Sequence, residues 1–189
     1  KSAGNEVTPL VRTRQDGILW NPPHEGPNPN AMTGCDAVVH LAGENIGNRR
    51  WSTAQKKRLY ESRVNATCAL CQSLASMEQV PRVLLSASAI GIYGDQGDEL
   101  LTEDSPSGDG FLAKLARDWE AATMVAEDAG IRVVHLRFGI VLSPKGGALA
   151  KMLTPFKFCL GGRVGNGRQW WSWVSLSDVV RAILYCLEN

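Results

Sequence analysis

The sequence predicts an α/β protein whose core is a doubly wound parallel sheet. Continuous apolar runs are typical of strands covered on both faces, and they alternate with segments of helical periodicity, as in a parallel sheet flanked by helices. Small, glycine and hydroxyl residues follow the strands, at the end where such sheets bind ligands. The expected strands occupy 6–11, 17–20, 36–45, 82–95 and 133–138, the third and fourth including their exits, and the expected helices occupy 53–76 and 112–129.

Length and composition describe an ordinary globular protein. The 189 residues suit one domain, or one domain with part of another, and 44% of them are hydrophobic and 21% charged. A formal net charge of +1 gives no reason to expect nucleic acid or an anionic membrane as a partner. No apolar run approaches the roughly 20 residues that span a bilayer. The five cysteines are an odd number within apolar patterns, which favours a reducing cytoplasm over a disulfide framework.

Two features inside regular elements are interpreted as structural. Cys68 and Cys71 form a Cys-x-x-Cys pair within a helical pattern, without a second pair or a nearby histidine. Burial is therefore favoured over a redox or zinc role. His40 lies within a strand rather than at its ligand-facing end, and we expect it to be packed.

Three strand ends carry residues that could bind a ligand. Arg12 and Arg14 follow the first strand, and their guanidinium groups either grip a phosphate or form a solvated basic turn. The Ala-Gly pair at 42–43 permits close approach of a ligand to the backbone. Ser86 and Ser88 end the central strand, where they either contact a ligand or only satisfy the turn.

Two polar residues stand out on the predicted helices. Asn65 interrupts the apolar half of the first helix, and a buried asparagine needs partners, so it either braces the backbone or reaches the site. Lys114 lies near the start of the second helix, where a cation is unfavourable against the helix dipole. That conflict suggests a compensating anion or a role at the site. Ser52 and Gln55 fit a capping box at the start of the first helix.

The composition changes from Ser143 onward. A short amphipathic helix at 148–158 leads to a glycine-rich loop at 161–169 with two arginines, then a short aromatic strand and a last helix at 178–187, capped by Ser175 or Ser177. We therefore expect 1–142 with 176–189 to form the core domain, and 143–175 to begin a small substrate-binding lobe.

The ordered set of motifs resembles the extended, or atypical, short-chain dehydrogenase/reductase superfamily, and more narrowly its NAD-dependent epimerase/dehydratase-like branch of "epimerase family" proteins. Each motif is weak alone, but together they span most of the chain in the expected order. They are Leu41-Ala42-Gly43-Glu44-Asn45, Arg49-Arg50-Trp51, Ser62-Arg63-Val64-Asn65-Ala66-Thr67, the segment 86–95, Lys114-Leu115-Ala116-Arg117-Asp118-Trp119-Glu120, the segment 136–142 and the segment 160–169.

The resemblance implies a Rossmann domain that binds NADP(H). By position in the motifs, the basic residue selects the 2′-phosphate, the third strand exit lines the adenosine side, and the later strands flank the nicotinamide. The residues implied are Arg12, Leu41, Ala42, Gly43, Glu44, Asn65, Ser86, Ala87, Lys114, Arg137, Gly139, Ile140 and Val141. It also implies a first strand and a glycine-rich phosphate loop upstream of Lys1, which this sequence lacks.

The resemblance implies a catalytic role for Ser88, as the hydroxyl that holds the substrate oxygen, and for Lys114, which holds the nicotinamide ribose. The usual catalytic tyrosine would stand four residues before Lys114, where this sequence has Gly110, and glycine cannot transfer a proton. Tyr93, in the turn after Ser88, is the candidate substitute.

Two functions follow from the resemblance. The first is an NADP(H)-dependent oxidoreductase or nucleotide-sugar epimerase-like enzyme acting on a small, nucleotide-linked hydroxyl or carbonyl substrate. The alternative is an NADPH-binding module with a sensing or scaffolding role and no turnover, for which Gly110 is the supporting feature. A structural interaction protein without a cofactor is a third, weaker possibility. Related proteins often form homodimers through two long helices, which here correspond to 53–76 and 112–129.

Overall fold

A computed structural model describes residues 4–13, 16–47, 49–163 and 165–189. Arg14, the second arginine of the predicted phosphate grip, lies outside the described residues. Among those residues, no helix is both long enough and apolar enough to cross a membrane.

The centre of the fold is a parallel sheet, as predicted, and its three strands stand in the order β3-β4-β5. They are β3 (Ala37–His40), β4 (Val83–Ala89) and β5 (Arg132–Phe138), and the register places His40 beside Ser86 and Ser86 beside His135. Two further parallel pairs stand apart from this sheet in the hydrogen-bond pattern. These are β1 (Leu10–Val11) with β2 (Ile18–Leu19), and β6 (Ile140–Leu142) with β7 (Trp173–Ser175).

The helix predicted over 53–76 is present, but it contains one wider turn. It consists of α1 (Thr53–Tyr60), the π-helical turn η2 (Glu61–Asn65) and α2 (Ala66–Ala75). The Ser52 Oγ accepts a hydrogen bond from the backbone N–H of Gln55 at 3.2 Å, which confirms the predicted N-cap. The helix predicted over 112–129 is divided into α3 (Gly110–Ala121) and α4 (Met124–Asp128).

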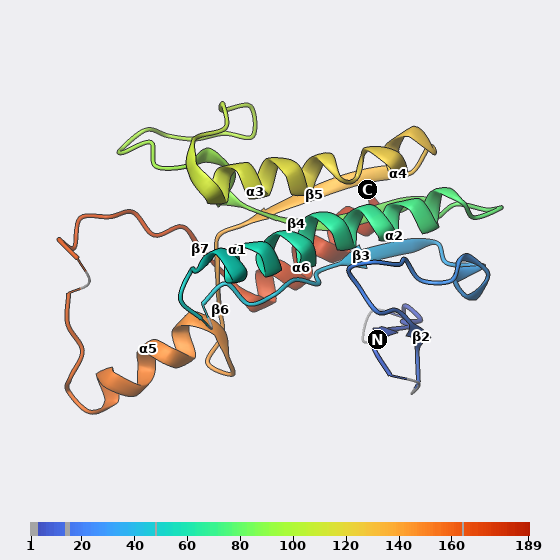
Figure 1. Cartoon of the computed structure of the whole chain (residues 1–189). Helices are drawn as coiled ribbons and strands as arrows, with labels where there is room; N and C mark the ends of the chain where they lie inside the picture. The colour runs from blue at the N-terminus through green and yellow to red at the C-terminus, as the bar shows by residue number, and fades with distance from the viewer. Residues whose placement is uncertain (1–3, 14–15, 48, 164) are drawn as a thin grey trace.

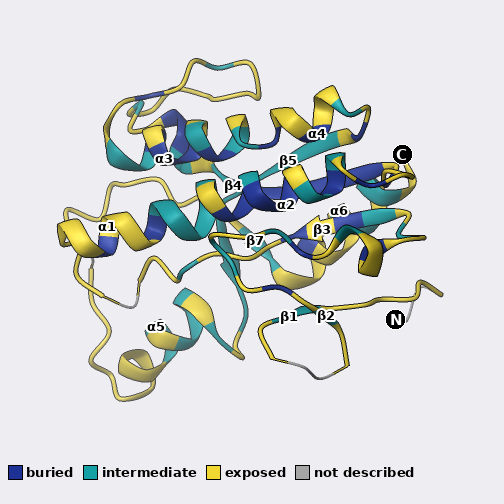
Figure 2. Cartoon of the chain, turned by 45° about the vertical axis from the view of Figure 1, so that its right-hand side comes forward, coloured by how far each residue is buried: buried dark blue, intermediate teal, exposed yellow. Residues whose placement is uncertain are grey.

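The helices form layers on the two faces of the sheet. Figure 1 shows α1–α2 and α3–α4 on one face, and α6 (Leu176–Glu188) on the other, where it packs on β4. The main core lies on the first face and includes Val38, Leu70, Leu74 and Leu84. Figure 2 shows this pattern as buried residues along the sheet and on the helix sides that face it. The doubly wound arrangement predicted from the sequence is therefore present.

Strand β3 differs from the prediction of a strand covered on both faces. The side chains of Val38 and His40 are 6% and 2% exposed, whereas Val39 between them is 40% exposed. Alternate residues of a strand point to opposite faces. Within the part of the chain that the structure describes, β3 is thus packed on the helix-covered face and open on the other, and the expectation of burial on both faces is wrong.

The segment after Ser143 extends away from the sheet. It contains α5 (Gly147–Lys157) and a long connection to β7, and both are mostly exposed in Figure 2. The Ser175 Oγ accepts a hydrogen bond from the backbone N–H of Asp178 at 3.1 Å, so Ser175 rather than Ser177 caps α6. Two short 3₁₀ turns, η1 (Pro29–Met32) and η3 (Ile90–Tyr93), complete the described elements.

Candidate functional site at the carboxyl edge of the sheet

The carboxyl ends of β3, β4 and β5 meet at one edge because the three strands are parallel. The exit of β3 runs through residues 41–47, β4 continues into η3, and β5 ends next to Gly139. Most of the residues predicted for the site lie on these exits. Open parallel sheets bind their ligands at this edge, which makes it the candidate site.

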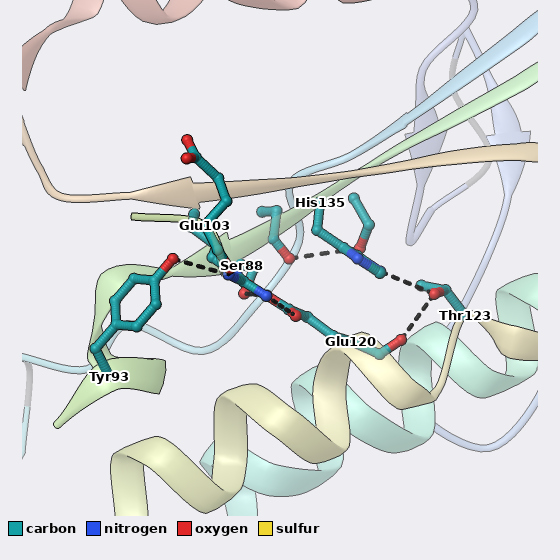
Figure 3. A network of polar contacts seen from close by, with 9 residues as sticks. Ser88, Tyr93, Glu103, Glu120, Thr123 and His135 are labelled. Atoms are coloured by element: carbon teal, nitrogen blue, oxygen red, sulfur yellow. Dashed lines mark hydrogen bonds and ion pairs between the residues drawn. The ribbon is translucent and has the colours of Figure 1, made fainter. Parts of the chain in front are cut away.

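Ser88 is joined to helix α3 through a carboxylate. Its Oγ donates a hydrogen bond of 2.5 Å to the Glu120 Oε1, and the Ser88 side chain is buried. The Arg137 guanidinium binds the same carboxylate in a bidentate way, since its Nε donates to Oε1 at 2.8 Å and its Nη2 donates to Oε2 at 2.9 Å. Figure 3 shows Ser88 and Glu120 meeting between the end of β4 and α3.

Tyr93 joins the same network from η3. Its hydroxyl accepts a hydrogen bond of 2.8 Å from the Arg137 Nη1, and the Arg137 Cζ lies 5.3 Å from the centre of the Tyr93 ring. The same Nη1 also donates to the backbone carbonyl of Glu103 at 2.9 Å. The structure therefore brings Ser88, Tyr93 and Arg137 together, and it directs the Tyr93 hydroxyl toward the end of β5.

The charges in this network stabilise one another. Burial raises the pKa of Glu120, but hydrogen bonds from Arg137 and Ser88 outweigh burial and hold that pKa below its usual value. The hydrogen bonds to Glu120 raise the pKa of Arg137. Glu120 is therefore an ionised acceptor, and the single proton of Ser88 is committed to it.

A hydroxyl and an imidazole extend the network along α3. The Thr123 Oγ1 donates to the backbone carbonyl of Glu120 at 2.7 Å and lies 2.9 Å from the His135 Nε2. A hydroxyl has one proton to donate, so we assign the proton of the second bond to His135. Beside Arg137 and His135, an open cavity of about 550 Å³ is also lined by Tyr93, residues 101–103 and Phe138.

Lys114 does not join Ser88 and Tyr93. Its Nζ donates to the Asp118 Oδ2 at 2.8 Å, one turn along α3, and its side chain is 66% exposed. This hydrogen bond raises the pKa of Lys114, and Tyr60 of α1 also hydrogen-bonds to Asp118. Asp118 is the compensating anion that the position of Lys114 near the helix start suggested.

Some of the residues predicted for the cofactor follow β1 and β3. Leu41 is 53% exposed, Ala42 and Gly43 are exposed, and Arg12 is exposed directly after β1. A Cβ at Gly43 would lie 3.2 Å from the Arg63 Cζ, so the guanidinium lies directly against this glycine. The backbone of segment 41–43 is thus accessible beside the Arg63 guanidinium. Exposed backbone next to a cation fits a dinucleotide with its phosphates.

Asn65, at the end of η2, is exposed, so the expectation of a buried asparagine with partners is wrong. Its exposure leaves its amide accessible at the end of the π-helical turn. The sequence reasoning failed here because Asn65 stands inside an apolar run, while the wider turn directs it outward.

Other predicted residues have packing partners of their own. Ser86 is 1% exposed and its Oγ donates to the Ala87 carbonyl at 3.4 Å, with Ala87 itself buried. A Cβ at Gly139 would collide with the Ser172 carbonyl at 2.5 Å. Residues 140 and 141 are half-buried and pair with β7. Their proposed roles beside a cofactor remain predictions.

His40 and the cysteines of the Cys-x-x-Cys pair were expected to be packed in the interior. His40 is buried, with its Nε2 2.9 Å from the Thr67 Oγ1, and burial lowers its pKa to about 4. This confirms a packed histidine. Cys71 lies in the main core and burial raises the pKa of its thiol to about 12. The described residues contain no group of three metal-ligating side chains.

Glu120 is the residue of this site that sequence reasoning missed. It lies on the same face of α3 as the buried Ala113 and Ala116, at spacings of four and seven residues. A carboxylate on a core-facing stripe needs a partner. That spacing was the available signal, because it predicts a charged residue directed at the sheet.

Comparison with known proteins identifies the family. Residues 29–189 match the sequence profile of the NAD dependent epimerase/dehydratase family. The chain belongs to this family. This confirms the resemblance drawn from the ordered motifs.

Relatives and solved structures agree with this membership. An epimerase family protein of Mycobacterium leprae is 44% identical over 172 residues, which are 91% of this chain and 55% of that protein. One from Mycobacterium bovis is 43% identical over 192 residues, covering 100% of this chain and 63% of that protein. The chain therefore spans a little over half the length of these curated relatives.

Two solved structures share the fold over nearly the whole chain. The structure of human epimerase family protein SDR39U1 (isoform2) with NADPH has a TM-score of 0.87 and 33% identity, covering 100% of this chain and 63% of that one. The nucleoside-diphosphate sugar epimerase of Corynebacterium glutamicum has a TM-score of 0.85 and 40% identity, covering 98% of this chain and 39% of that one. The predicted Rossmann-type α/β fold is confirmed.

Proposed function

We propose that this chain provides part of an NADP(H)-dependent, epimerase-like oxidoreductase. One observation carries the proposal: the exit of β3 is a bare, glycine-containing segment, and the neighbouring parallel strand β4 ends in a buried polar network. An exposed arginine, Arg12, follows β1. The human relative of the same fold was solved with NADPH. The proposal transfers that cofactor to the matching edge of this sheet.

On the cofactor side, the exposed Arg12 guanidinium holds the 2′-phosphate through charge-assisted hydrogen bonds. Segment 41–44 lies against the adenosine half, because its small residues allow close backbone approach. When bound, the nicotinamide supplies hydride acceptance and donation. Asn65 and residues 139–141 complete this side of the proposed site.

On the substrate side, Ser88 acts as a hydrogen-bond acceptor. Its proton is donated to Glu120, so its Oγ offers only lone pairs to a bound molecule. That arrangement suits a substrate hydroxyl better than a substrate carbonyl. The Tyr93 hydroxyl accepts from Arg137 and retains its own proton to donate. We propose Tyr93 as the group that takes the place of the missing tyrosine, and Lys114 as the ribose contact.

The substrate class follows from the chemistry of the lobe. Residues 143–175 contain five basic residues and no acidic residue, the bases being Lys145, Lys151, Lys157, Arg163 and Arg168. A cationic lobe favours an anionic substrate, and the Corynebacterium glutamicum structure is named as a nucleoside-diphosphate sugar epimerase. We propose a nucleotide-linked sugar. A homodimer and a cytoplasmic location remain predictions.

A second function is favoured by one specific observation. Lys114 is bound to Asp118 on the exposed side of α3, and Gly110 stands where the family tyrosine would be, so the usual tyrosine and lysine pair does not form. This favours an NADPH-binding module without turnover, with a sensing or scaffolding role. The two functions share the cofactor site and differ only in the chemical step.

Titration with NADPH and with NADH, followed by nicotinamide fluorescence, tests the proposal on this chain joined to the family's glycine-rich phosphate loop, whose backbone N–H groups hold the pyrophosphate. NADPH should bind at least ~10-fold more tightly than NADH, and Arg12→Ala should abolish the difference, since tenfold corresponds to about 1.4 kcal/mol, the strength of one hydrogen bond to a charged group. Binding of neither nucleotide would refute the proposal. A screen of nucleotide sugars then separates the two functions, because turnover of any of them excludes a binding module without turnover. Ser88→Ala is tested in the same screen, and turnover that survives this change excludes the role of Ser88.

A further inference from the structure

Side-chain contacts connect the last residue of β3, His40, with Glu44 in the exit that follows it. The His40 Nε2 lies 2.9 Å from the Thr67 Oγ1, and Thr67 also accepts a hydrogen bond of 2.9 Å from the Trp119 indole. The Arg63 Cζ lies 5.2 Å from the Trp119 ring centre, and the Arg63 Nη2 donates to the Glu44 carbonyl at 3.0 Å. The two ends of segment 41–43 are therefore attached to one connected set of side chains.

The turn η2 holds Glu44 a second time. The backbone N–H of Glu44 donates to the Ser62 Oγ at 3.0 Å, and that Oγ donates in turn to the Leu59 carbonyl at 3.2 Å. Two successive residues of η2, Ser62 and Arg63, thus satisfy both backbone polar groups of Glu44. A π-helical turn is rare and occurs often at functional sites, and here it contacts the segment proposed to bind the cofactor.

The environment of Arg63 favours a positioning role over a stabilising one. Burial lowers the pKa of Arg63, which measures the cost of removing this cation from water. Its hydrogen-bond acceptors among the described residues are the carbonyls of Glu44 and Leu59, the latter at 3.5 Å. The Trp119 ring lies beside its guanidinium, and the charge of Glu44 partly offsets the effect of burial on its pKa. A half-buried arginine whose hydrogen-bond acceptors are backbone carbonyls contributes little net stability. What Arg63 does provide is a fixed support beneath the backbone of Gly43.

We propose that Ser62 and Arg63 are positioning residues that fix the conformation of segment 41–44 for binding the dinucleotide. They act through the backbone of Glu44 and do not contact the cofactor. This inference rests on the proposed NADP(H) function. It deepens that function by placing the determinant of affinity on a helix turn behind the site.

Ser62→Ala is the decisive variant, and Ser76→Ala is its matched control. Ser76 also donates its hydroxyl to a carbonyl three residues earlier, that of Ser73 at 2.8 Å, but at the far end of α2. In the protein used for the NADPH titration, Ser62→Ala should raise the Kd for NADPH about 5-fold and speed amide hydrogen exchange at Glu44 about 10-fold, as expected for the loss of one hydrogen bond. The urea midpoint should be nearly unchanged. Ser76→Ala should change neither the Kd nor the exchange rate.

Arg63→Lys provides the second variant, because lysine keeps the charge and loses the planar fork. It should raise the Kd for NADPH about 10-fold. An unchanged Kd in Ser62→Ala overturns the inference even if Arg63→Lys fails to fold. Failure of the proposed function is distinguishable, since the wild-type chain itself would then not bind NADPH. Hydrogen exchange at Glu44 reports on the positioning contact without any cofactor, and unchanged exchange in Ser62→Ala also overturns the inference.

Discussion

Protonation of His40 should couple the stability of this fold to pH. The folded state lowers the pKa of His40 from 6.5 to about 4, because the ring is buried against Trp20 and Thr67. The unfolded chain therefore binds a proton below pH 6.5 that the folded chain does not bind. Stability is fully present above pH 6.5 and is lost as the pH falls toward 4. The loss from this one group should be about 1.4 kcal/mol at pH 5.5 and about 3 kcal/mol near pH 4.

Urea unfolding at pH 7.5, 6.5, 5.5 and 4.5 measures this effect against His40→Gln. The variant loses the ring contact with Trp20 and is less stable at pH 7.5, but it lacks the titrating group. The stability gap between wild type and variant should therefore shrink as the pH falls. His24→Gln is the control, since His24 is exposed, and it should keep the wild-type pH dependence. A His40→Gln protein that loses stability with the wild-type slope would refute the reasoning.

Three further predictions concern the polar network and the thiols. Glu120→Gln should lower the free energy of unfolding by about 2 kcal/mol in urea titrations, because it leaves the Arg137 guanidinium without its carboxylate; a loss below 0.5 kcal/mol would contradict it. Cys71 should resist a thiol reagent at pH 8 while the exposed Cys159 reacts, since burial raises the pKa of Cys71 to about 12; equal rates would exclude this. Lys114→Met should change stability by less than ~0.5 kcal/mol, as for exposed ion pairs, yet weaken NADPH binding in fluorescence titrations; unchanged binding would remove Lys114 from the site.

The order of strands and helices could be predicted because apolar periodicity determines it. The sequence around Val38 and Leu84 indicates buried strands, and both lie in the core. The same periodicity cannot report what covers each face of a strand. Val39 is as apolar as its neighbours, yet it is 40% exposed, since coverage depends on which helices pack there.

The site could be predicted only as far as strand ends determine it. Ser88 and Tyr93 follow one another at the end of β4, and the structure joins them through Glu120 and Arg137. The direction of Lys114 and the role of Glu120 depend on how α3 is rotated against the sheet. That rotation results from side-chain packing between distant segments, which one sequence without its structure does not reveal.

The wider turn η2 has a consequence for the alignment of the long helix. Buried residues recur every four positions on either side of it, at Gln55 and Leu59 and again at Leu70 and Leu74. In an α-helix, a four-residue repeat advances about 40° per repeat, and the drift from residue 55 to residue 74 sums to about 100°. One extra residue in a π turn takes back a rotation of about the same size. The wider turn therefore keeps the buried residues of α1 and α2 on the same side of the helix. Deleting a single residue within Glu61–Asn65 would leave about 18 residues between the two ends, or about five whole turns of a regular α-helix, so the two halves would stay in phase and the wider turn would no longer be needed.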